Sequence, residues 1–471
     1  MCESTNFIVA NIEINARRGG YGGITLRSSY LTEDVVLLLK DITGSVQPQS
    51  TEEREKLIQA GRHYSEMLPV EYVPTEKYME VYREALYRYA KQVADAVGVL
   101  SDRIMAARGR DVVLVSLARA GTPVGILIRR YIRLKYRVDI PHYSISIIRG
   151  RGIDGNAMQY LLDRYRPEQL LFVDGWIGKG AILGELEKDV RAYPGVSPEI
   201  AVVADPAGVT ELCGTHEDIL IPSSCLNSTV SGLISRTFLR DDIIGEKDFH
   251  GAVYYEELKD SDLSYEFIET IEKNFSIEDP LPNPESGFGR PGREETGEAG
   301  NGGPKGKETG EAGNGGPEGE ETGEAGNSGP EGKETGEAGN SGPEGKEAGE
   351  AGNSGPEGKE AGEARNSGPE GKEADNAEET SGSRGKGIDE VREIAAFFGI
   401  EDINFIKPGI GETTRVLLRR VPWKVLVDER YRGNPELSHV IRLAEEKQVP
   451  VEYYPLIHYK CCGIIKKLAD A

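Results

Sequence analysis

The sequence is poor in cysteine and has no long apolar segment. Its five cysteines, at positions 2, 213, 225, 461 and 462, are too few and too irregularly spaced for a disulfide framework. They also lack the spacing of a metal site, so none is expected. No stretch reaches the roughly 18 apolar residues that a membrane helix needs. The N-terminus lacks the basic and then apolar pattern of a secretory signal. We therefore expect a cytoplasmic protein with no membrane partner.

Residues 281–387 contain almost no apolar side chains. No Val, Ile, Leu, Phe, Tyr or Trp occurs between Glu294 and Ala374, where a repeat rich in Gly, Glu and Pro recurs. The block holds 24 acidic and 11 basic residues, so it carries more than half of the chain's formal charge of −23. Such a segment cannot bury enough apolar surface to offset the entropy of ordering. We predict a disordered linker between a domain at 1–280 and a domain at 388–471.

The first 280 residues alternate apolar runs of strand length with helical periodicity. Helices are predicted over 76–107, 122–134, 156–165 and 181–190, and strands over 112–117, 143–148, 170–173, 200–204 and 219–221. This alternation indicates an α/β fold with a doubly wound parallel sheet. Ligands of such sheets bind beyond the carboxyl ends of the strands, so the loops there are candidate sites.

The last segment predicts a smaller α/β domain. Helices are expected over 389–398, 436–448 and 463–469, and strands over 414–418, 424–427 and 451–454. The segment is long enough to fold as a unit.

Two loops after predicted strands carry arginines suited to an anion. In Arg119-Ala120-Gly121, the arginine precedes a helix N-terminus, whose free N–H groups and partial positive charge favour pyrophosphate. Arg149 and Arg151 lie in a glycine-hinged loop, which is the composition of a mobile lid over a charged substrate. An ordinary turn with an exposed arginine and a flexible surface loop are the alternatives.

A third loop follows the predicted strand at 170–173. Gly178 and Gly180 let the backbone close around a phosphate, and Lys179 between them supplies charge. Asp174 ends the strand, where a carboxylate can hold ribose hydroxyls or a Mg²⁺ shell. A glycine turn with a solvated lysine is the alternative.

The order of these loops resembles that of type I phosphoribosyltransferases. The resemblance implies that Arg119 holds pyrophosphate, that Arg149 and Arg151 close over it, and that Asp174 holds the ribose. It implies that the loop at 178–180 binds the 5-phosphate of phosphoribosyl pyrophosphate, a phosphorylated small-molecule substrate, with Mg²⁺ as the cofactor. The sequence departs from the family motif in having one acid at Asp174 where two are usual. We expect a phosphoribosyltransferase-like enzyme.

Residues 61–68, 204–208 and 221–232 resemble a narrower family. They are similar to the phosphoribosyltransferase-like family of tellurium-resistance and stress gene clusters, which is also called the StiP cysteine protease family. Members carry a C-terminal PELOTA RNA-binding domain, which residues 411–424 and 443–452 resemble. The resemblance implies a role in stress or tellurium resistance.

The protease name provides the alternative to a transferase. Cys225 lies in a serine-rich turn that is expected to precede a helix, where a helix N-terminus lowers the pKa of a thiol. His63, His142 and His216 are candidate bases for such a nucleophile, and the sequence does not choose among them. A non-catalytic nucleotide- or RNA-binding regulatory protein is a further alternative.

A basic patch in the last segment favours RNA as a partner. Arg415, Arg419, Arg420 and Lys424 lie within ten residues of one another, with no acid between them. Trp423 offers a face on which an unpaired base can stack. A solvated edge strand with a core tryptophan is the alternative.

Overall fold

The structure is a computed structural model, and it describes residues 26–59, 61–277 and 386–466. All of these residues belong to one compact unit. We call 26–277 the N-terminal domain and 386–466 the C-terminal domain. The linker predicted at 281–387 lies outside the described residues, except that its last two residues begin a helix.

A seven-stranded sheet forms the centre of the N-terminal domain. Six strands run parallel in the order β1-β4-β3-β6-β7-β8, and β5 pairs antiparallel with β4. The strands are β1 (Val36–Leu37), β3 (Val113–Ala118), β4 (His142–Ile148), β5 (Gly152–Ile153), β6 (Leu170–Trp176), β7 (Ile200–Ala204) and β8 (Cys213–Thr215). The prediction of an α/β fold with a parallel sheet is confirmed.

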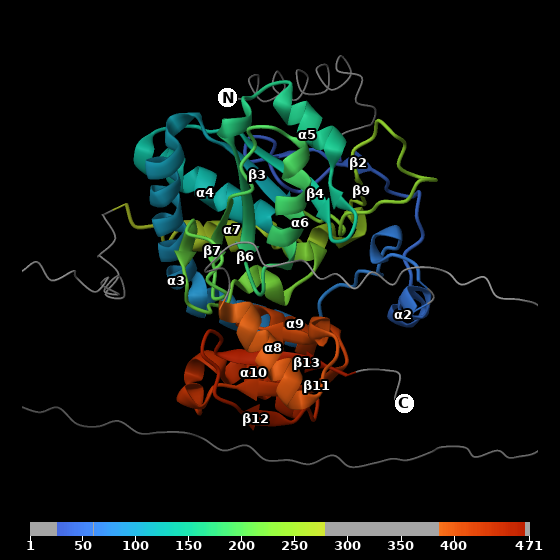
Figure 1. The fold of residues 1–471 in the computed structure, drawn as a ribbon, viewed down its shortest axis with the longest axis vertical. Helices are drawn as coiled ribbons and strands as arrows, with labels where there is room; N and C mark the ends of the chain where they lie inside the picture. Colours follow the sequence, from blue (N-terminus) through green and yellow to red (C-terminus); the bar gives the residue numbers. More distant parts are fainter. Residues whose placement is uncertain (1–25, 60, 278–385, 467–471) are drawn as a thin grey trace, which may run out of the picture. The chain divides into compact units, whose positions relative to one another are not determined.

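Helices cover both faces of this sheet (Figure 1). Residues of α3, α4 and α7 share one core with Leu114 of β3, and residues of α5 and α6 share a second core with Val113 and Val115. Successive strand residues point to opposite faces, so a strand buried on both faces reads as a continuous apolar run. The helices are α2 (Thr51–Gln59), α3 (Glu76–Arg108), α4 (Gly121–Tyr136), α5 (Gly155–Leu162), α6 (Ala181–Asp189) and α7 (Ser264–Glu272).

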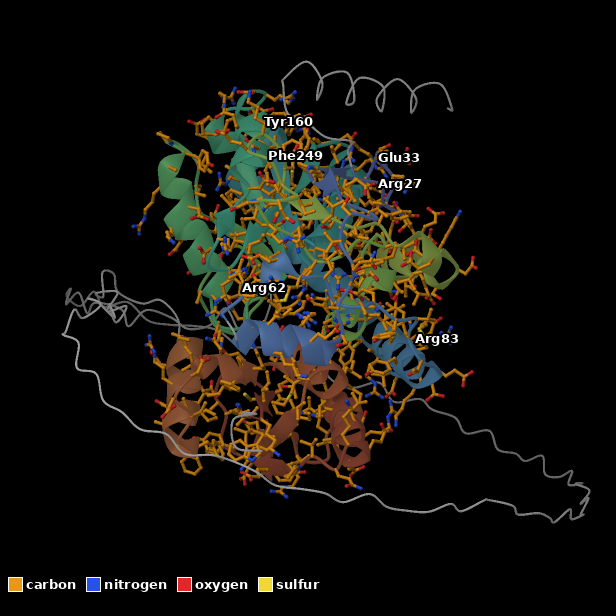
Figure 2. The ribbon with its side chains drawn as sticks, turned by 90° about the vertical axis from the view of Figure 1, so that its right-hand side faces the viewer. Arg27, Glu33, Arg62, Arg83, Tyr160 and Phe249 are labelled. Atoms are coloured by element: carbon orange, nitrogen blue, oxygen red, sulfur yellow. The ribbon has the colours of Figure 1, made fainter. Side chains whose placement is uncertain are left out.

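Close side-chain contacts hold the helices together on each face of the sheet. Gly98 of α3 lies against the ring of Tyr131 of α4, which a Cβ at Gly98 would approach to 3.1 Å. On the other face, Tyr160 of α5 packs edge to face on Phe249, with ring centroids 6.0 Å apart (Figure 2).

Short elements complete the N-terminal domain. Strands β2 (Lys40–Asp41) and β9 (Gly251–Ala252) form a separate parallel pair. The 3₁₀ turns of this domain are η1 (Tyr64–Glu66), η2 (Gly109–Asp111), η3 (Pro167–Gln169), η4 (Val190–Ala192), η5 (Pro222–Cys225), η6 (Ser228–Val230) and η7 (Glu256–Ser261). No helix in the described part of the chain is long and apolar enough to cross a membrane.

The C-terminal domain has a four-stranded sheet in the order β10-β13-β11-β12. Strand β13 pairs antiparallel with both of its neighbours, and β11 pairs parallel with β12. Helix α8 packs on one face, and α9 and α10 pack on the other. The elements are α8 (Lys386–Phe398), η8 (Ile403–Phe405), β10 (Ile406–Pro408), α9 (Ile410–Arg419), β11 (Pro422–Val427), η9 (Glu429–Tyr431), η10 (Pro435–Leu437), α10 (Ser438–Glu446), β12 (Val451–Tyr453) and β13 (Cys461–Ile465).

Three predicted elements differ from those observed. The strand predicted at 414–418 is part of α9, because Ile410, Thr414 and Leu417 bury one helical face. The helix predicted at 463–469 begins as strand β13, and 467–471 lie outside the described residues. The strand predicted at 219–221 is buried irregular chain, and β8 takes the next position in the sheet.

One core runs through both domains. Leu220 and Cys225 of the N-terminal domain belong to the same buried cluster as Ile410 and Leu417 of α9. The carboxylate of Asp218 makes the main polar connection: its oxygens accept from the backbone N–H of Ile410 at 2.9 and 3.2 Å, and Oδ2 accepts from that of Lys460 at 2.9 Å. Asp218 thereby caps α9, whose first N–H groups lack partners within the helix.

Further bonds connect the two domains. The hydroxyl of Tyr78 donates to the carbonyl of Leu418 at 2.5 Å, and that of Tyr459 donates to the carbonyl of Gly178 at 2.6 Å. We call the region in which the two domains contact each other the joint.

The carboxyl group of Asp218 is buried in the joint. Burial raises its pKa to about 6, and the hydrogen bonds from its backbone donors act in the opposite direction.

We predict that Asp218→Ala destabilises the protein. The substitution leaves the buried N–H groups of Ile410 and Lys460 without their acceptor, and each such loss costs about 1–3 kcal/mol. Urea unfolding near neutral pH measures the effect. Asp241→Ala, at an exposed position, is the control. Equal stability of the two variants would show that the cap does not hold the joint.

Candidate functional site

The turn after β3 brings Arg119 to the joint. Its Nη1 donates to the carbonyl of Ile234 at 2.7 Å, and its guanidinium lies 3.4 Å from Oε1 of Glu71. Ala120 is exposed at the turn, and α4 begins at Gly121, where a Cβ would lie 2.3 Å from the carbonyl oxygen of Val173. The turn therefore has the predicted shape, and a neighbouring carboxylate offsets the charge of its arginine.

The loop after β6 contacts the C-terminal domain. Lys179 Nζ donates to the carbonyls of Ile403 at 2.6 Å and Ile406 at 3.3 Å, so its amine holds β10 and the turn before it. Burial lowers the pKa of Lys179 to about 8. Gly178 lies beside Pro408, and Gly180 has a φ of 82° directly before α6. The glycine turn is present as predicted, and its lysine has partners within the protein.

Asp174 lies within β6, which extends to Trp176 rather than ending at the predicted Val173. Its Oδ1 accepts from the N–H of Gly175 at 2.7 Å. Burial raises the pKa of Asp174 to about 7, and Arg415 and Glu412 of α9 act on it in opposite directions. No group of three or more His, Cys, Asp or Glu side chains able to hold a metal occurs in the described ranges, and Mg²⁺ stays a prediction.

The basic loop predicted as a lid is a short hairpin between β4 and β5. Arg149 Nη1 donates to Oδ1 of Asn404 in the C-terminal domain at 2.9 Å. Arg151 Nη2 lies 2.6 Å from Oε1 of Glu66. Both side chains are exposed at their present positions, and each has a partner within the protein.

Cys225 lies in η5 and is buried at the joint. Burial raises the pKa of its thiol to about 12, and nearby Arg419 opposes this. None of the three predicted bases contacts it within the described ranges. His63 Nε2 lies against the carbonyl of Arg149, and His142 bonds Ser116 and the carbonyl of Asp34.

His216 contacts another thiol, that of Cys213 on β8. Sγ of Cys213 lies 3.4 Å from Nε2 and 3.7 Å from Nδ1 of His216. Nδ1 donates to the carbonyl of Asp205 at 2.9 Å, and Oδ2 of Asp205 lies 3.7 Å from it. Because a carbonyl can only accept, this bond fixes the proton on Nδ1 and leaves the Nε2 lone pair free. Cys213, His216 and Asp205 thus form a row of contacts. The thiol lies against the imidazole, and Asp205 orients the imidazole from its other side.

His216 is among the bases predicted from the sequence, whereas Cys213 is not a predicted site residue. The relevant signal is a Cys and a His three residues apart, which is too common to identify a site. The contact arises because β8 pairs with β7, which returns the chain to the carbonyl of Asp205. Burial, and secondarily Asp205, raises the pKa of Cys213 to about 11, so the thiol is protonated near neutral pH. The ring of His216 is half exposed, while Cys213 is buried.

The predicted basic patch divides into paired and unpaired cations. Arg415 lies 3.0 Å from Glu412, and Lys424 lies 2.5 Å from Glu452. The side chains of Arg419 and Arg420, exposed at the end of α9, have no hydrogen bond or ion pair with any described residue.

Trp423 lies at a shift in strand register between Pro422 and Lys424. It packs edge to face on Phe398 of α8, with Lys424 Nζ 4.4 Å from its ring centroid, and 39% of its area is exposed. Part of the Trp423 side chain is therefore exposed, and part is covered by Phe398 and Lys424.

The loops of the N-terminal domain and the patch of the C-terminal domain meet at the joint. A pocket there is lined by Trp176, Gly178 and Asp218 from one side, and by Pro408 and Glu412 from the other. The guanidinium of Arg415 lies 5.9 Å from the centroid of the Trp176 ring. Two sites predicted separately are thus adjacent.

Both domains match known protein families. A family model described as "Tellurite-like stress resistance cysteine protease StiP" matches residues 28–272, and a model described as "PELOTA RNA binding domain" matches residues 385–467. A relative named "Cysteine protease StiP", from Acinetobacter baylyi (strain ATCC 33305 / BD413 / ADP1), is 38% identical over 255 residues. The alignment covers 52% of this chain and 66% of the relative, a little less than two thirds of its length.

These names overturn the predicted activity. The family model and the relative are both named as cysteine proteases, so the prediction of a phosphoribosyltransferase-like transferase is wrong. The resemblance to stress-resistance proteins with a PELOTA domain is confirmed. The finer resemblance to the phosphoribosyltransferase fold, and the phosphorylated small-molecule substrate, have no support from these matches.

We predict that Asp174 gives the protein a stability that falls as pH rises. Its pKa is about 7 in the folded protein against 3.8 ordinarily, so between these values the folded state holds a proton that the unfolded chain has released. The contribution is present below the window and is lost as pH rises through it. Urea unfolding at pH values on both sides should show a weaker pH dependence for Asp174→Asn than for the wild-type protein. A parallel dependence in both would place the titration elsewhere.

Proposed function

Because the chain belongs to the StiP family, whose model matches residues 28–272, we propose that its N-terminal domain is a thiol-dependent peptidase that acts in stress resistance. The observation that supports a particular nucleophile is the contact of Cys213 Sγ with His216 Nε2 at 3.4 Å. It is the only thiol–imidazole contact among the described residues. We assign Cys213 as nucleophile, His216 as base and Asp205 as the group that orients the imidazole.

In the proposed reaction, Nε2 of His216 takes the proton of Cys213, and the thiolate attacks the carbonyl carbon of the peptide. A C–S bond forms, and the imidazolium returns its proton to the amine as the C–N bond breaks. Water, deprotonated by the same imidazole, then hydrolyses the thioester and frees the thiol.

In the structure, Cys213 and His216 are in contact but are not yet aligned for this proton transfer. Sγ is nearly equidistant from the two ring nitrogens, so it faces the ring rather than lying in line with the Nε2 lone pair. A turn of the ring of His216 aligns the pair, and catalytic contacts commonly tighten only when substrate is bound. Substrate reaches the sulfur from the side of the exposed imidazole, since Cys213 itself is buried.

The test compares two buried cysteines of the same domain. We expect Cys213→Ala and His216→Ala to abolish cleavage of labelled, denatured casein, because both remove a reacting group. Cys225→Ala should retain cleavage, since no imidazole of the described residues contacts that thiol. Circular dichroism verifies the folding of each variant. Cleavage lost only in Cys225→Ala would instead make Cys225 the nucleophile, and cleavage unchanged in Cys213→Ala would reject our assignment.

The match of residues 385–467 supports RNA binding by the C-terminal domain as a second function. The structure favours Arg419 and Arg420 as phosphate contacts, because they are exposed and their side chains form no ion pair or hydrogen bond with a described residue. Arg415 and Lys424 are paired with acids, and Trp423 offers only part of its ring.

We predict that Arg419→Gln with Arg420→Gln weakens RNA binding by the full-length chain. Each lost phosphate contact with a single strand should lower the slope of log affinity against log salt by about 0.7. Anisotropy titrations with labelled single-stranded RNA at several salt concentrations measure this. Arg392→Gln, at an exposed position on α8 that is paired with Asp389, is the control. An unchanged slope in the double variant would remove these arginines from the RNA site.

A further inference from the structure

Cations from both domains gather at the joint. Arg119 and Arg236 come from the N-terminal domain. Lys407 comes from β10, Arg419 from the end of α9, and Arg420 directly follows that helix. We call these five the joint cluster. The positive charges of Arg119 and Arg420 lower the pKa of Arg236, and that of Arg119 lowers the pKa of Arg419. Lys407 lies in the field of Arg420. The end of α9 meets the N-terminal domain here, since the carbonyl of Leu418 accepts from the hydroxyl of Tyr78 at 2.5 Å, so the cluster has members on both sides of the joint.

Carboxylates offset little of this charge. Arg119 has an ion-pair partner, Glu71 at 3.4 Å. For the other four side chains, no hydrogen bond or ion pair connects them to a described residue; Arg236 packs on the ring of Tyr64, with its guanidinium 5.6 Å from the centroid.

Acidic side chains do lie near the joint cluster, but they already interact with other arginines. Glu71 acts on Arg419 as well as Arg119, and Glu412 acts on Lys407 while it is paired with Arg415 at 3.0 Å. Asp174 also faces Arg415. Burial, followed by the neighbouring arginines, lowers the pKa of Arg236 to about 10.

Such a cluster is unfavourable without a ligand. Like charges held close together repel, and a partly desolvated site strengthens that repulsion. In a chain of formal charge −23, these cations could have been paired with acids. A polyanion, which carries charges at spaced positions, compensates more of these cations than a single charged group does.

We infer that RNA runs across the joint, and that Arg119 and Arg236 of the N-terminal domain bind its phosphates together with Arg419 and Arg420. The inference rests on the RNA-binding part of the proposed function and extends it to the peptidase domain. RNA is the polyanion because three of the five cations belong to the domain that matches an RNA-binding family. The site requires phosphate spacing rather than a base sequence, since charged side chains make it.

The experiment titrates the full-length chain with labelled single-stranded oligouridylate over a range of salt concentrations. Arg236→Gln should weaken binding several-fold and lower the salt slope by about 0.7, and adding Arg119→Gln should lower it by a similar step. Arg236→Lys keeps the charge and should keep the slope. Arg133→Gln, at an exposed position on α4, is the matched control. A thermal melt verifies the folding of each variant.

The outcomes separate this inference from the proposed function. If Arg419→Gln with Arg420→Gln weakens binding but Arg236→Gln does not, RNA contacts the C-terminal domain alone and the inference is wrong. If Arg236→Lys loses as much binding as Arg236→Gln, the arginine acts by packing on Tyr64 and not by charge, which also overturns it. Wild-type protein that binds no RNA at low salt would reject both the inference and the proposed RNA binding. If Arg119→Gln fails to fold, the comparison of Arg236→Gln with Arg236→Lys tests the inference without it.

Discussion

The carboxylate of Asp218 is the interaction on which the rest of the joint depends. It accepts from the first residue of α9 and from Lys460, and so it fixes both the start of that helix and the strand beside it. Once α9 is fixed there, Arg415 lies over Trp176, and the charge of Arg119 acts on Arg419. The pocket and the joint cluster both follow from where this helix begins.

Charge is distributed unevenly over the chain. Acids dominate the sequence, yet Arg236, Arg419 and Arg420, which form no ion pair within the described part of the chain, collect with the paired Arg119 where the two domains meet. A local positive region on an acidic protein attracts a polyanion only there, because the surrounding acids repel it elsewhere. Binding at the joint would place RNA beside Cys225, which lies in the field of Arg419, whereas the proposed nucleophile Cys213 belongs to the edge strand β8.

The layered part of the fold could be predicted from sequence, and the site could be predicted only in part. The apolar run that contains β3 is buried on both faces, and such runs are visible in sequence. The strand predicted at 414–418 is wrong because a short apolar run reads as either strand or helix. In the structure, Ile410 and Leu417 bury one face of α9 in the core shared with the N-terminal domain. The turns at Arg119 and Lys179, which are predicted to bind an anion, are present. Their partners in the structure, Glu71 and the carbonyls of Ile403 and Ile406, are distant in sequence. The pairing of Cys213 with His216 depends on sheet order, which local pattern does not encode.

The two tryptophans provide the most direct test of the central claim, which is that the two domains form one cooperative unit closed at the joint. Trp176 reports on the N-terminal domain and Trp423 on the C-terminal domain, and the sequence has no other tryptophan. Urea unfolding followed by fluorescence is measured on Trp423→Phe and on Trp176→Phe, with circular dichroism on each. A joint that couples the domains predicts that, within each variant, fluorescence and circular dichroism give one coincident transition. Fluorescence transitions that depart from the circular dichroism transition, with each tryptophan reporting its own domain, would show that the domains unfold independently and would contradict the account.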